Sequence, residues 1–431
     1  MISLEDIYAH FLETQKISID SRKIERNCIF FALKGENFNG NKYAEDALKK
    51  GASYAIVDEA EFATNNNTLL VEDVLTTLQQ LAYHHRHKLC IPILAITGTN
   101  GKTTTKELIS AVLAKEFNVS FTQGNLNNHI GVPLTLLRMD KNTEFGVVEM
   151  GANHCGEIMD LCKIADPDFG IITNIGRAHL EGFGSFEGII KTKGELFDYL
   201  ERKNGTIFYN SDNELLVKLA KAVANRISYG QKNASFTGET VQSPPFIHVK
   251  VSFKKGVLYL NSNLIGDFNF ENILAAACIG NHFKVDPIKI QQAIKEYQPS
   301  NNRSQLINSG EIKIIMDAYN ANPTSMVASI KSFLENLNGD KFLILGDMLE
   351  LGQYSREEHT KIIEMIPSQL KSSTFLIGEE FAKVNTEESI KTFKQVDDFC
   401  AFLKNNPIKK GNILIKGSRG IQLEKTLDLL N

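Results

Sequence analysis

Residues 93–104 carry the clearest chemistry in the sequence. An apolar run leads into residues 97–104, Thr-Gly-Thr-Asn-Gly-Lys-Thr-Thr, and a helix is expected to begin near Thr103. Gly98 and Gly101 would let backbone N–H groups face a ligand without a side-chain clash, and the helix N-terminus would add the positive end of its dipole. Such a turn cradles phosphates, so the segment predicts ATP or GTP binding.

Two side chains of this loop have tasks of their own. Lys102 can reach the β- and γ-phosphates, and the Thr103 hydroxyl can bind Mg²⁺. The usual pattern has a further glycine where this chain has Ile96, so a glycine-rich turn without a ligand is the alternative. The strand–loop–helix context favours the nucleotide. The loop residues expected to contact it are Gly98, Thr99, Asn100, Gly101, Lys102, Thr103 and Thr104.

Polar residues also follow neighbouring strands of the predicted sheet. Glu149 lies at the end of the predicted strand 146–150, and His179 lies in the loop after the predicted strand 170–174. Ligands of open α/β sheets collect at the carboxyl ends of the strands, so both side chains should lie near the phosphates. Glu149 can hold Mg²⁺, because hard cations prefer oxygen ligands. His179 is an unusual Mg²⁺ ligand, and a loop histidine bonded to the backbone is the alternative.

Lys193 follows that loop within a predicted helix. Spacing alone indicates an exposed surface lysine. If it is buried instead, its pKa falls. The neutral amine could then act as a nucleophile or take up CO₂ as a carbamate, which is an anion.

The last third of the chain has three polar, glycine-rich strand ends, at residues 317–323, 346–352 and 416–420. They predict a second ligand-facing surface, with helix caps or tight turns as the alternative for each. Arg303 could reach a phosphate across a domain cleft, or could be a surface arginine. Residues 83–87, Tyr-His-His-Arg-His, lack a partnering carboxylate or cysteine set, and we interpret them as a basic helix end rather than a metal site.

The helices and strands that must position these residues predict an α/β fold. A chain of 431 residues suits two to four domains, and we divide it at 1–90, 91–299 and 300–431. A helix capped by Ser3 with apolar positions including Leu12 opens the first part. Strand–helix alternation in the second and third parts predicts parallel sheets covered on both faces, with an antiparallel insertion at 235–270. The predicted strands are 28–33, 55–57, 69–71, 93–97, 119–122, 146–150, 170–174, 206–209, 312–316, 341–345, 374–377 and 412–415.

Composition narrows the classes of function. A net charge of −4 gives no indication of a nucleic-acid binder. No apolar run approaches the roughly 20 residues that span a bilayer, and the first residues lack the features of a signal peptide. Six cysteines without CxxC spacing favour a reducing compartment. We therefore expect a cytoplasmic protein without membrane insertion. A monomer is also expected, although composition does not indicate the oligomeric state.

Five strings taken together resemble the Mur ligases of peptidoglycan synthesis: residues 97–104, 124–133, 149–152, 174–184 and 317–323. The resemblance covers essentially the whole chain, and residues 346–352 and 416–419 point to one member of the family. It implies an α/β architecture of three domains: a small N-terminal α/β domain, a central parallel-sheet P-loop ATPase domain and a C-terminal Rossmann-like domain. It also implies ATP-dependent amide ligation, here of D-alanyl-D-alanine to UDP-N-acetylmuramoyl-tripeptide through an acyl phosphate.

The resemblance carries roles over to individual residues. Residues 1–90 would bind the UDP precursor, 91–299 would bind ATP, and 300–431 would serve the amino substrate and act as a lid hinged at 299–302. The implied catalytic residues are Lys102, Glu149, His179 and Lys193. The implied Mg²⁺ ligands are Thr103, Glu149, His179 and a carbamylated Lys193. Asn272 matches the adenine contact, Asp317 the ribose contact, and Arg303 the arginine that reaches ATP. The implied organic-substrate contacts are Ser21, Arg22, Asn125, Asn127, Asn128, Asn320, Asn322, Lys416, Ser418 and Arg419.

Other functions remain open from sequence alone. One alternative is a related ligase that adds glutamate to folate or a different amino acid to the same sugar-peptide. Another is a nucleotide-sensing or mechanical P-loop protein, in which hydrolysis moves a partner. That protein would need neither Glu149 with His179 nor a separate UDP-binding domain.

Overall fold

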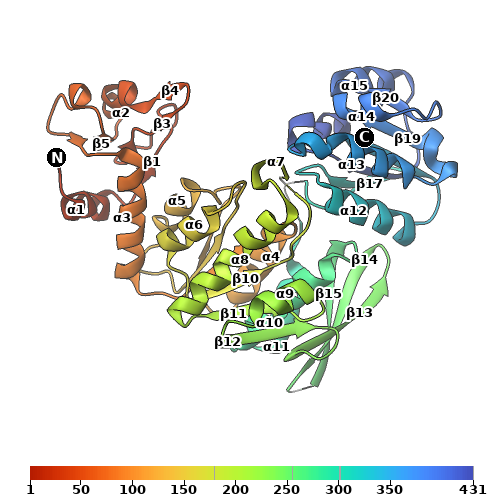
Figure 1. Ribbon diagram of the computed structural model, residues 1–431, viewed down its shortest axis with the longest axis horizontal. Helices are drawn as coiled ribbons and strands as arrows, with labels where there is room; N and C mark the ends of the chain where they lie inside the picture. Colours follow the sequence, from red (N-terminus) through yellow and green to blue (C-terminus); the bar gives the residue numbers. More distant parts are fainter. Residues whose placement is uncertain (179, 255, 300–301, 431) are drawn as a thin grey trace.

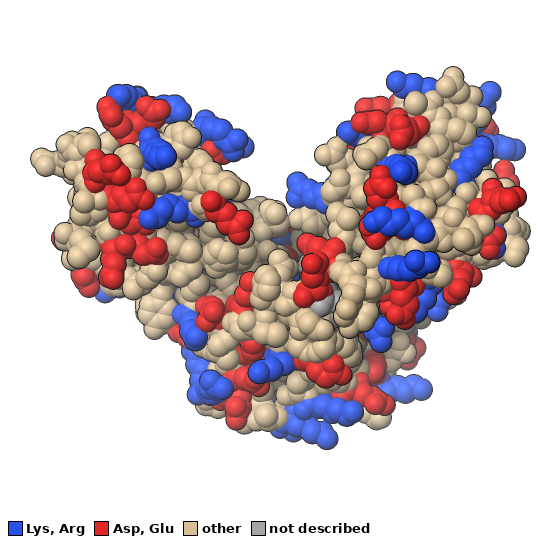
Figure 2. Space-filling model, turned by 45° about the horizontal axis from the view of Figure 1, so that its top comes forward, with Lys and Arg blue, Asp and Glu red and all other residues tan. Residues whose placement is uncertain are grey.

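The computed structural model describes residues 1–178, 180–254, 256–299 and 302–430. The chain forms a first and a third domain that stand apart on either side of a larger central domain (Figure 1). The space-filling view shows the deep notch between these two outer domains (Figure 2). No helix among the described residues has the length and apolar character needed to cross a membrane.

The first domain is built on a four-stranded parallel sheet of order β1-β2-β5-β6. The helix α1 begins after Ser3, whose side chain accepts a hydrogen bond from the Asp6 N–H, as the capping prediction required. Ile7 and Phe11 are buried, whereas Leu12, predicted to be on the same apolar face, is 50% exposed. The elements of this domain are α1 (Leu4–Thr14), β1 (Ile17–Ser18), β2 (Ile29–Phe31), β3 (Lys34–Gly35), β4 (Phe38–Asn39), α2 (Ala44–Lys49), β5 (Tyr54–Val57) and β6 (Thr68–Leu70).

The central domain contains a nine-stranded sheet of order β15-β14-β13-β12-β11-β10-β7-β9-β8. Its strands are β7 (Ile93–Thr97), β8 (Val119–Phe121), β9 (Phe145–Glu149), β10 (Phe169–Ile172), β11 (Thr206–Asn210), β12 (Asn225–Gly230), β13 (Phe236–Ser243), β14 (Phe246–Phe253) and β15 (Gly256–Ile265). The last three strands are antiparallel, as predicted. They do not form a separate insertion, however, because β13 pairs in parallel with β12 and continues the same sheet.

Both faces of this sheet are covered, and β7 shows how the sequence achieves it. Side chains alternate between faces along a strand. Ile93 and Ala95 accordingly join one buried cluster, and Leu94 and Ile96 join another. The first cluster includes side chains of α3 (Val74–Leu89), α5 (Gly131–Leu136), α6 (Glu157–Ala165), α8 (Phe186–Lys203) and α9 (Glu214–Ala220). The second includes side chains of α4 (Lys102–Leu113), α10 (Asn269–His282) and α11 (Pro287–Glu296).

The third domain is a six-stranded sheet of order β16-β17-β21-β18-β19-β20, parallel except for the β16–β17 pair. Its strands are β16 (Gln305–Ser309), β17 (Ile312–Asp317), β18 (Lys341–Gly346), β19 (Thr374–Ile377), β20 (Lys391–Phe393) and β21 (Gly411–Lys416). Its helices are α12 (Pro323–Asn336), α13 (Ser355–Glu364), α14 (Glu379–Val384) and α15 (Val396–Asn405). The four strands predicted here are present, and the two edge strands β16 and β20 were not predicted.

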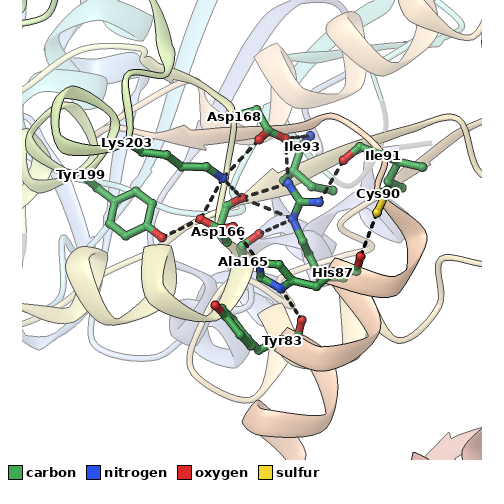
Figure 3. Close-up of polar contacts among 11 residues, drawn as sticks. Tyr83, His87, Cys90, Ile91, Ile93, Ala165, Asp166, Asp168, Tyr199 and Lys203 are labelled. Carbon is green, nitrogen blue, oxygen red and sulfur yellow. Dashed lines mark hydrogen bonds and ion pairs between the residues drawn. The ribbon is translucent and has the colours of Figure 1, made fainter.

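The helix α3 runs out of the first domain and fixes it to the central one. Arg86, buried near the end of α3, pairs with Asp168 at 2.7 Å and donates to the carbonyls of Ala165, Asp166 and Ile91. From α8, Lys203 pairs with both Asp166 and Asp168, and the Tyr199 hydroxyl donates to Asp166 (Figure 3). Because a buried guanidinium needs all its donors satisfied, this network holds the end of α3 in one orientation.

The histidine-rich stretch at 83–87 lies in the last two turns of α3. This position agrees with its interpretation as a basic helix end. It is not a solvated end, however, since His85 is 4% exposed and its Nε2 lies 2.7 Å from the Met139 carbonyl. Within the described part of the chain, no group of three or more His, Cys, Asp or Glu side chains is arranged to hold a metal. The stretch therefore serves domain docking.

Candidate active site

A cavity of about 940 Å³ lies between the central and third domains. Its lining brings the phosphate loop, the end of β9 and the start of α10 together with residues that open the third domain. Pockets of this size with a few convergent polar groups are typical small-molecule sites. The predicted site residues on the cavity wall are Gly98, Thr99, Asn100, Gly101, Lys102, Thr103, Thr104, Asn125, Asn127, Asn128, Glu149, Lys193, Asn272, Arg303, Asp317, Asn320 and Lys416.

The phosphate loop has the predicted strand–loop–helix form. The strand β7 ends at Thr97 and α4 begins at Lys102, one residue before the predicted start. Gly98 and Gly101 have φ values of 142° and 77°, a region that favours glycine. A Cβ at Gly98 would also collide with the Thr173 hydroxyl, and one at Gly101 would lie 2.7 Å from Asn272 Oδ1. Both glycines are therefore required by the backbone and by close neighbours.

Two residues that the sequence reasoning did not single out hold the loop in shape. The Asn100 N–H donates to Asn174 Oδ1 at 2.9 Å, and the Asn100 carbonyl accepts from Asn174 Nδ2 at 3.0 Å and Thr173 Oγ1 at 2.7 Å. Thr173 and Asn174 directly follow β10, which pairs in parallel with β7. That position beside the loop is the signal that could have identified them.

Lys102 is turned onto its own loop. Its Nζ donates to the carbonyls of Gly98 at 2.8 Å and Thr99 at 3.1 Å. Desolvation lowers the pKa of the ammonium, the charge of Glu149 opposes this shift, and Arg303 adds to it. Lys102 and Arg303 are thus two cations whose fields overlap at this end of the cavity, which suits a polyanionic ligand.

Glu149 and Thr103 provide oxygen ligands that fit Mg²⁺. Thr103 Oγ1 lies 2.9 Å from Glu149 Oε2, and Asn127 Nδ2 donates to Glu149 Oε1 at 2.8 Å. Metal–oxygen distances of about 2.1 Å in an octahedron place neighbouring ligand atoms about 3.0 Å apart. The hydroxyl and the carboxylate therefore already have the spacing of two adjacent Mg²⁺ ligands. His179, the third predicted ligand, lies outside the described residues.

Lys193 is buried, so the spacing-based expectation of an exposed lysine is wrong. Its side chain is 3% exposed, its Nζ lies 3.5 Å from the Ala152 carbonyl, and it sits 5.4 Å from the centre of the Phe183 ring. Desolvation, with a smaller contribution from the charge of Lys102, lowers the pKa of Lys193 to about 7. A large fraction of this amine is therefore neutral near neutral pH.

Arg303 and Tyr319 form a stacked pair on the third-domain side of the cavity. The guanidinium carbon of Arg303 lies 3.7 Å from the centre of the Tyr319 ring, and that of exposed Arg419 lies 5.5 Å from the same ring. Arg303 Nε is buried without a hydrogen-bond partner. Because stacking fixes the plane of a guanidinium without using its N–H groups, Tyr319 holds Arg303 ready for an anion.

This pair gives a first prediction. Replacing Tyr319 with leucine should raise the apparent Kd for ATP about 5- to 30-fold, because a desolvated cation–π contact contributes about 1–2 kcal/mol. Replacing it with phenylalanine keeps the ring and should change the Kd less than about twofold. Isothermal titration calorimetry measures both values. Equal loss of affinity in the two variants would show that the hydroxyl, and not the ring, is what matters.

The polar strand ends of the third domain divide into two kinds. Asp317 faces the cavity, pairs with buried Lys416 at 2.7 Å and accepts from the Ser329 hydroxyl at 2.8 Å. Asp347 does not face a ligand, because it caps α14 by accepting from the N–H groups of Glu380 and Phe381 at 2.8 and 2.9 Å. The ligand-facing prediction therefore fits residues 317–320 and Lys416, and the helix-cap alternative fits residues 346–352.

Some predicted substrate contacts lie away from the cavity. Ser21 and Arg22 belong to the first domain, which lies across the notch from the third domain (Figure 2). Exposed Arg22 pairs with Asp20 at 2.9 Å. Ser418 Oγ accepts from the Leu349 N–H at 3.0 Å and stabilises the neighbouring loop. Asn322 caps α12 and bonds to Asn100. The structure thus brings the nucleotide-side residues together and leaves the sugar-side residues on a separate lobe.

Comparison with known protein families gives three matches in chain order. They are to the catalytic domain of the Mur ligase family at residues 13–89, the Mur ligase middle domain at 96–280, and the glutamate ligase domain of Mur ligases at 302–419. Curated relatives named UDP-N-acetylmuramoyl-tripeptide–D-alanyl-D-alanine ligase include that of Bacillus subtilis. It is 35% identical over 421 residues, which covers 95% of this chain and 91% of the relative. The Escherichia coli relative of that name is 30% identical, covering 96% of this chain and 93% of its own.

Solved structures agree with these matches. MurF from Acinetobacter baumannii has a TM-score of 0.86 at 29% identity, covering 97% of this chain and 93% of that one. MurF ligase from Thermotoga maritima in complex with ADP has a TM-score of 0.86 at 27% identity and covers 97% of both chains.

Proposed function

The chain belongs to the Mur ligase family, and from this membership we propose that it joins D-alanyl-D-alanine to UDP-N-acetylmuramoyl-tripeptide at the expense of ATP. The single observation that carries the proposal is the convergence of Lys102, Glu149 and Lys193 with the third-domain residues Arg303 and Asp317 on one cavity. Family membership also removes the alternative of a mechanical P-loop protein. The reaction belongs to peptidoglycan precursor synthesis, for which we propose a cytoplasmic location.

The proposed reaction activates an inert acid. A carboxylate resists attack by an amine because an oxide ion is a poor leaving group. Its oxygen therefore first attacks the γ-phosphorus of ATP, which forms an acyl phosphate and releases ADP. The amine of D-alanyl-D-alanine then attacks the acyl carbon, loses a proton, and expels inorganic phosphate. One ATP becomes ADP and phosphate for each amide bond formed.

Two anions meet in the first step, so the cavity must supply positive charge. Lys102 sits on the phosphate loop and Arg303 on the opposite wall, where they screen the β- and γ-phosphates. Thr103 and Glu149 would hold Mg²⁺ at their 2.9 Å spacing. When bound, Mg²⁺ supplies Lewis-acid neutralisation of the phosphate charge.

We propose that Lys193 is used as its carbamate. Its burial and a pKa of about 7 leave the amine free to attack CO₂. The product carries a negative charge and two oxygen atoms, which suit a hard divalent cation. His179 stays a predicted partner of that cation, by family resemblance alone.

The remaining assignments follow the family pattern. Residues 1–90, with Ser21 and Arg22, bind the UDP end, and Asn125, Asn127 and Asn128 line the path of the peptide. Within residues 91–299, Asn272 faces adenine, and Asp317 takes the ribose from the third domain. Residues 300–431 receive the amino substrate. The contacts that the family pattern implies there are Asn320 and Lys416 on the cavity wall, and Asn322, Ser418 and Arg419 outside it.

Release of ADP tests the proposed function. Purified protein is given ATP and Mg²⁺ with both organic substrates, with each alone, and with neither. We expect ADP and phosphate in equal amounts only with both, together with an amide product seen by mass spectrometry. Lysine, diaminopimelate or glutamate in place of D-alanyl-D-alanine should give no product. Equal ADP release without the sugar-peptide would contradict the proposal.

A further inference from the structure

Two asparagine side chains join the phosphate loop to the third domain. Asn322 Nδ2 donates to Asn100 Oδ1 at 2.8 Å, and Asn100 Nδ2 lies 3.4 Å from Asn322 Oδ1. The residues are 222 positions apart in the chain. Two facing amides bond in both directions only when they lie close and face to face, so the pair fixes a distance and an orientation.

Each partner is held rigidly by its own domain. The backbone of Asn100 is bonded through its N–H and its carbonyl to Asn174 and Thr173, so the point from which its side chain extends is fixed on the central domain. Asn322 is 6% exposed and caps α12 through Oδ1, which accepts from the Ser325 N–H at 2.9 Å. The Ser325 hydroxyl completes the capping box by accepting from the Asn322 N–H at 3.1 Å. The amide pair thus links two fixed points.

Further contacts seat the third domain around this pair. A Cβ at Gly176 would lie 3.0 Å from Thr324 Oγ1, which shows close packing of the loop after β10 against the start of α12. Arg177 pairs with Glu358 of α13 at 3.5 Å. The first of these contacts also reaches the phosphate loop, because the Gly176 N–H donates to Thr99 Oγ1 at 2.9 Å and the Gly176 carbonyl accepts from the same hydroxyl at 3.2 Å. The Asn100–Asn322 pair differs in reaching the loop directly from the third domain.

We propose that the Asn100–Asn322 pair positions the phosphate loop in response to docking of the third domain. Phosphoryl transfer then runs at full rate only when the domain that receives the amine is seated. This inference rests on the proposed function and adds a physical link between its two steps. An acyl phosphate formed with the third domain undocked would be open to water, and the link disfavours its formation.

Two substitutions remove the link without removing the structure around it. Asn322→Ser keeps a good helix cap, because serine caps as well as asparagine, but it lacks the amide donor. Asn100→Ser keeps the loop backbone and its bonds to Asn174. The variant with both substitutions completes a double-mutant cycle. Arg177→Ala is the matched control, because it removes a different contact between the domains, a surface ion pair that should contribute little. Melting temperatures check that all four variants fold.

We expect each single variant to lower kcat about 3- to 10-fold, the loss appropriate to one neutral hydrogen bond. KM for ATP should change less than kcat, and the double variant should be no slower than the slower single variant. Arg177→Ala should stay within about twofold of the parent kcat. The inference would be overturned if the fold-losses of kcat in the two single variants multiplied in the double variant. It would also be overturned if either single variant kept the parent kcat.

A second readout separates this inference from the proposed function. The Kd for ADP in the presence of Mg²⁺ is measured by calorimetry for the parent, both single variants and the double variant. This measurement needs no turnover. Non-additive losses of affinity support the link even if the parent protein fails to ligate these substrates, a failure that would count against the proposed function alone. Additive losses would contradict the link whatever the reaction proves to be.

Discussion

Replacing Lys102 with alanine should lower kcat for ligation about 10²- to 10³-fold. The ammonium is held on the phosphate loop by the carbonyls of Gly98 and Thr99, where it faces the charge that develops as the γ-phosphoryl group transfers. Loss of one such electrostatic group costs about 3–4 kcal/mol of transition-state stabilisation. Steady-state release of ADP measures the rate. Binding of the sugar-peptide, followed separately by calorimetry, should be retained.

A lysine just after the same helix provides the control. Lys115 follows α4 and pairs at the surface with Glu296 at 2.7 Å. Lys115→Ala should keep the parent rate within about twofold, because surface ion pairs contribute little. Normal turnover by the Lys102 variant would exclude the role assigned to this residue.

Replacing Lys193 with alanine should reduce ligation to below about 1% of the parent rate, on the scale of one lost electrostatic group. Short-chain carboxylic acids added to this variant should restore part of the activity. The truncated side chain leaves space in which a small carboxylate can supply the missing anion. Lys191, exposed two residues earlier on α8, gives the matched control, and Lys191→Ala should behave as the parent.

The carbamate adds a dependence on pH and CO₂. Only the neutral amine attacks CO₂, and burial lowers the pKa of Lys193 to about 7. The reactive fraction is therefore high above pH 7 and falls as the pH drops through that value. At pH 6, activity should decline faster in buffer freed of CO₂ than in buffer that contains bicarbonate. Addition of ¹³C-bicarbonate should give an NMR signal from the carbamate. Full activity of Lys193→Ala, or no signal from the parent protein, would exclude the carbamate.

The phosphate loop could be predicted because its causes are local. An apolar strand, two glycines and a following helix need no information from the rest of the chain, and β7 has the predicted bounds. The strand β12, in contrast, begins with polar Asn225 and Arg226 and is defined by backbone pairing with β11. The edge strand β16 likewise depends on its antiparallel partner β17. Whether such segments form strands depends on pairing partners that local sequence patterns do not identify.

The candidate site shows the same division. Glu149 could be placed from its position after a strand, whereas the burial of Lys193 depends on the packing of α8 against α6 and on Phe183. Likewise, nothing in residues 317–323 distinguishes a ligand contact from a helix cap. Only the fold brings Asn322 to Asn100. Arg303 and Asp317 could be assigned to the nucleotide from the sequence, whereas the Asn100–Asn322 pair, whose residues are 222 positions apart, could not.

The clamp on Arg86 has a consequence for the size of molecule that the protein accepts. With Arg86 held by Asp168 and three carbonyls, the end of α3 is anchored on the central domain, and the helix carries the first domain as an arm across the notch from the third domain (Figure 2). A molecule anchored at the tip of that arm reaches the reacting end of the cavity only if its own chain is long enough. If residues 1–90 bind the UDP end as proposed, a precursor with too few peptide residues would fail by length alone, before any side chain is recognised.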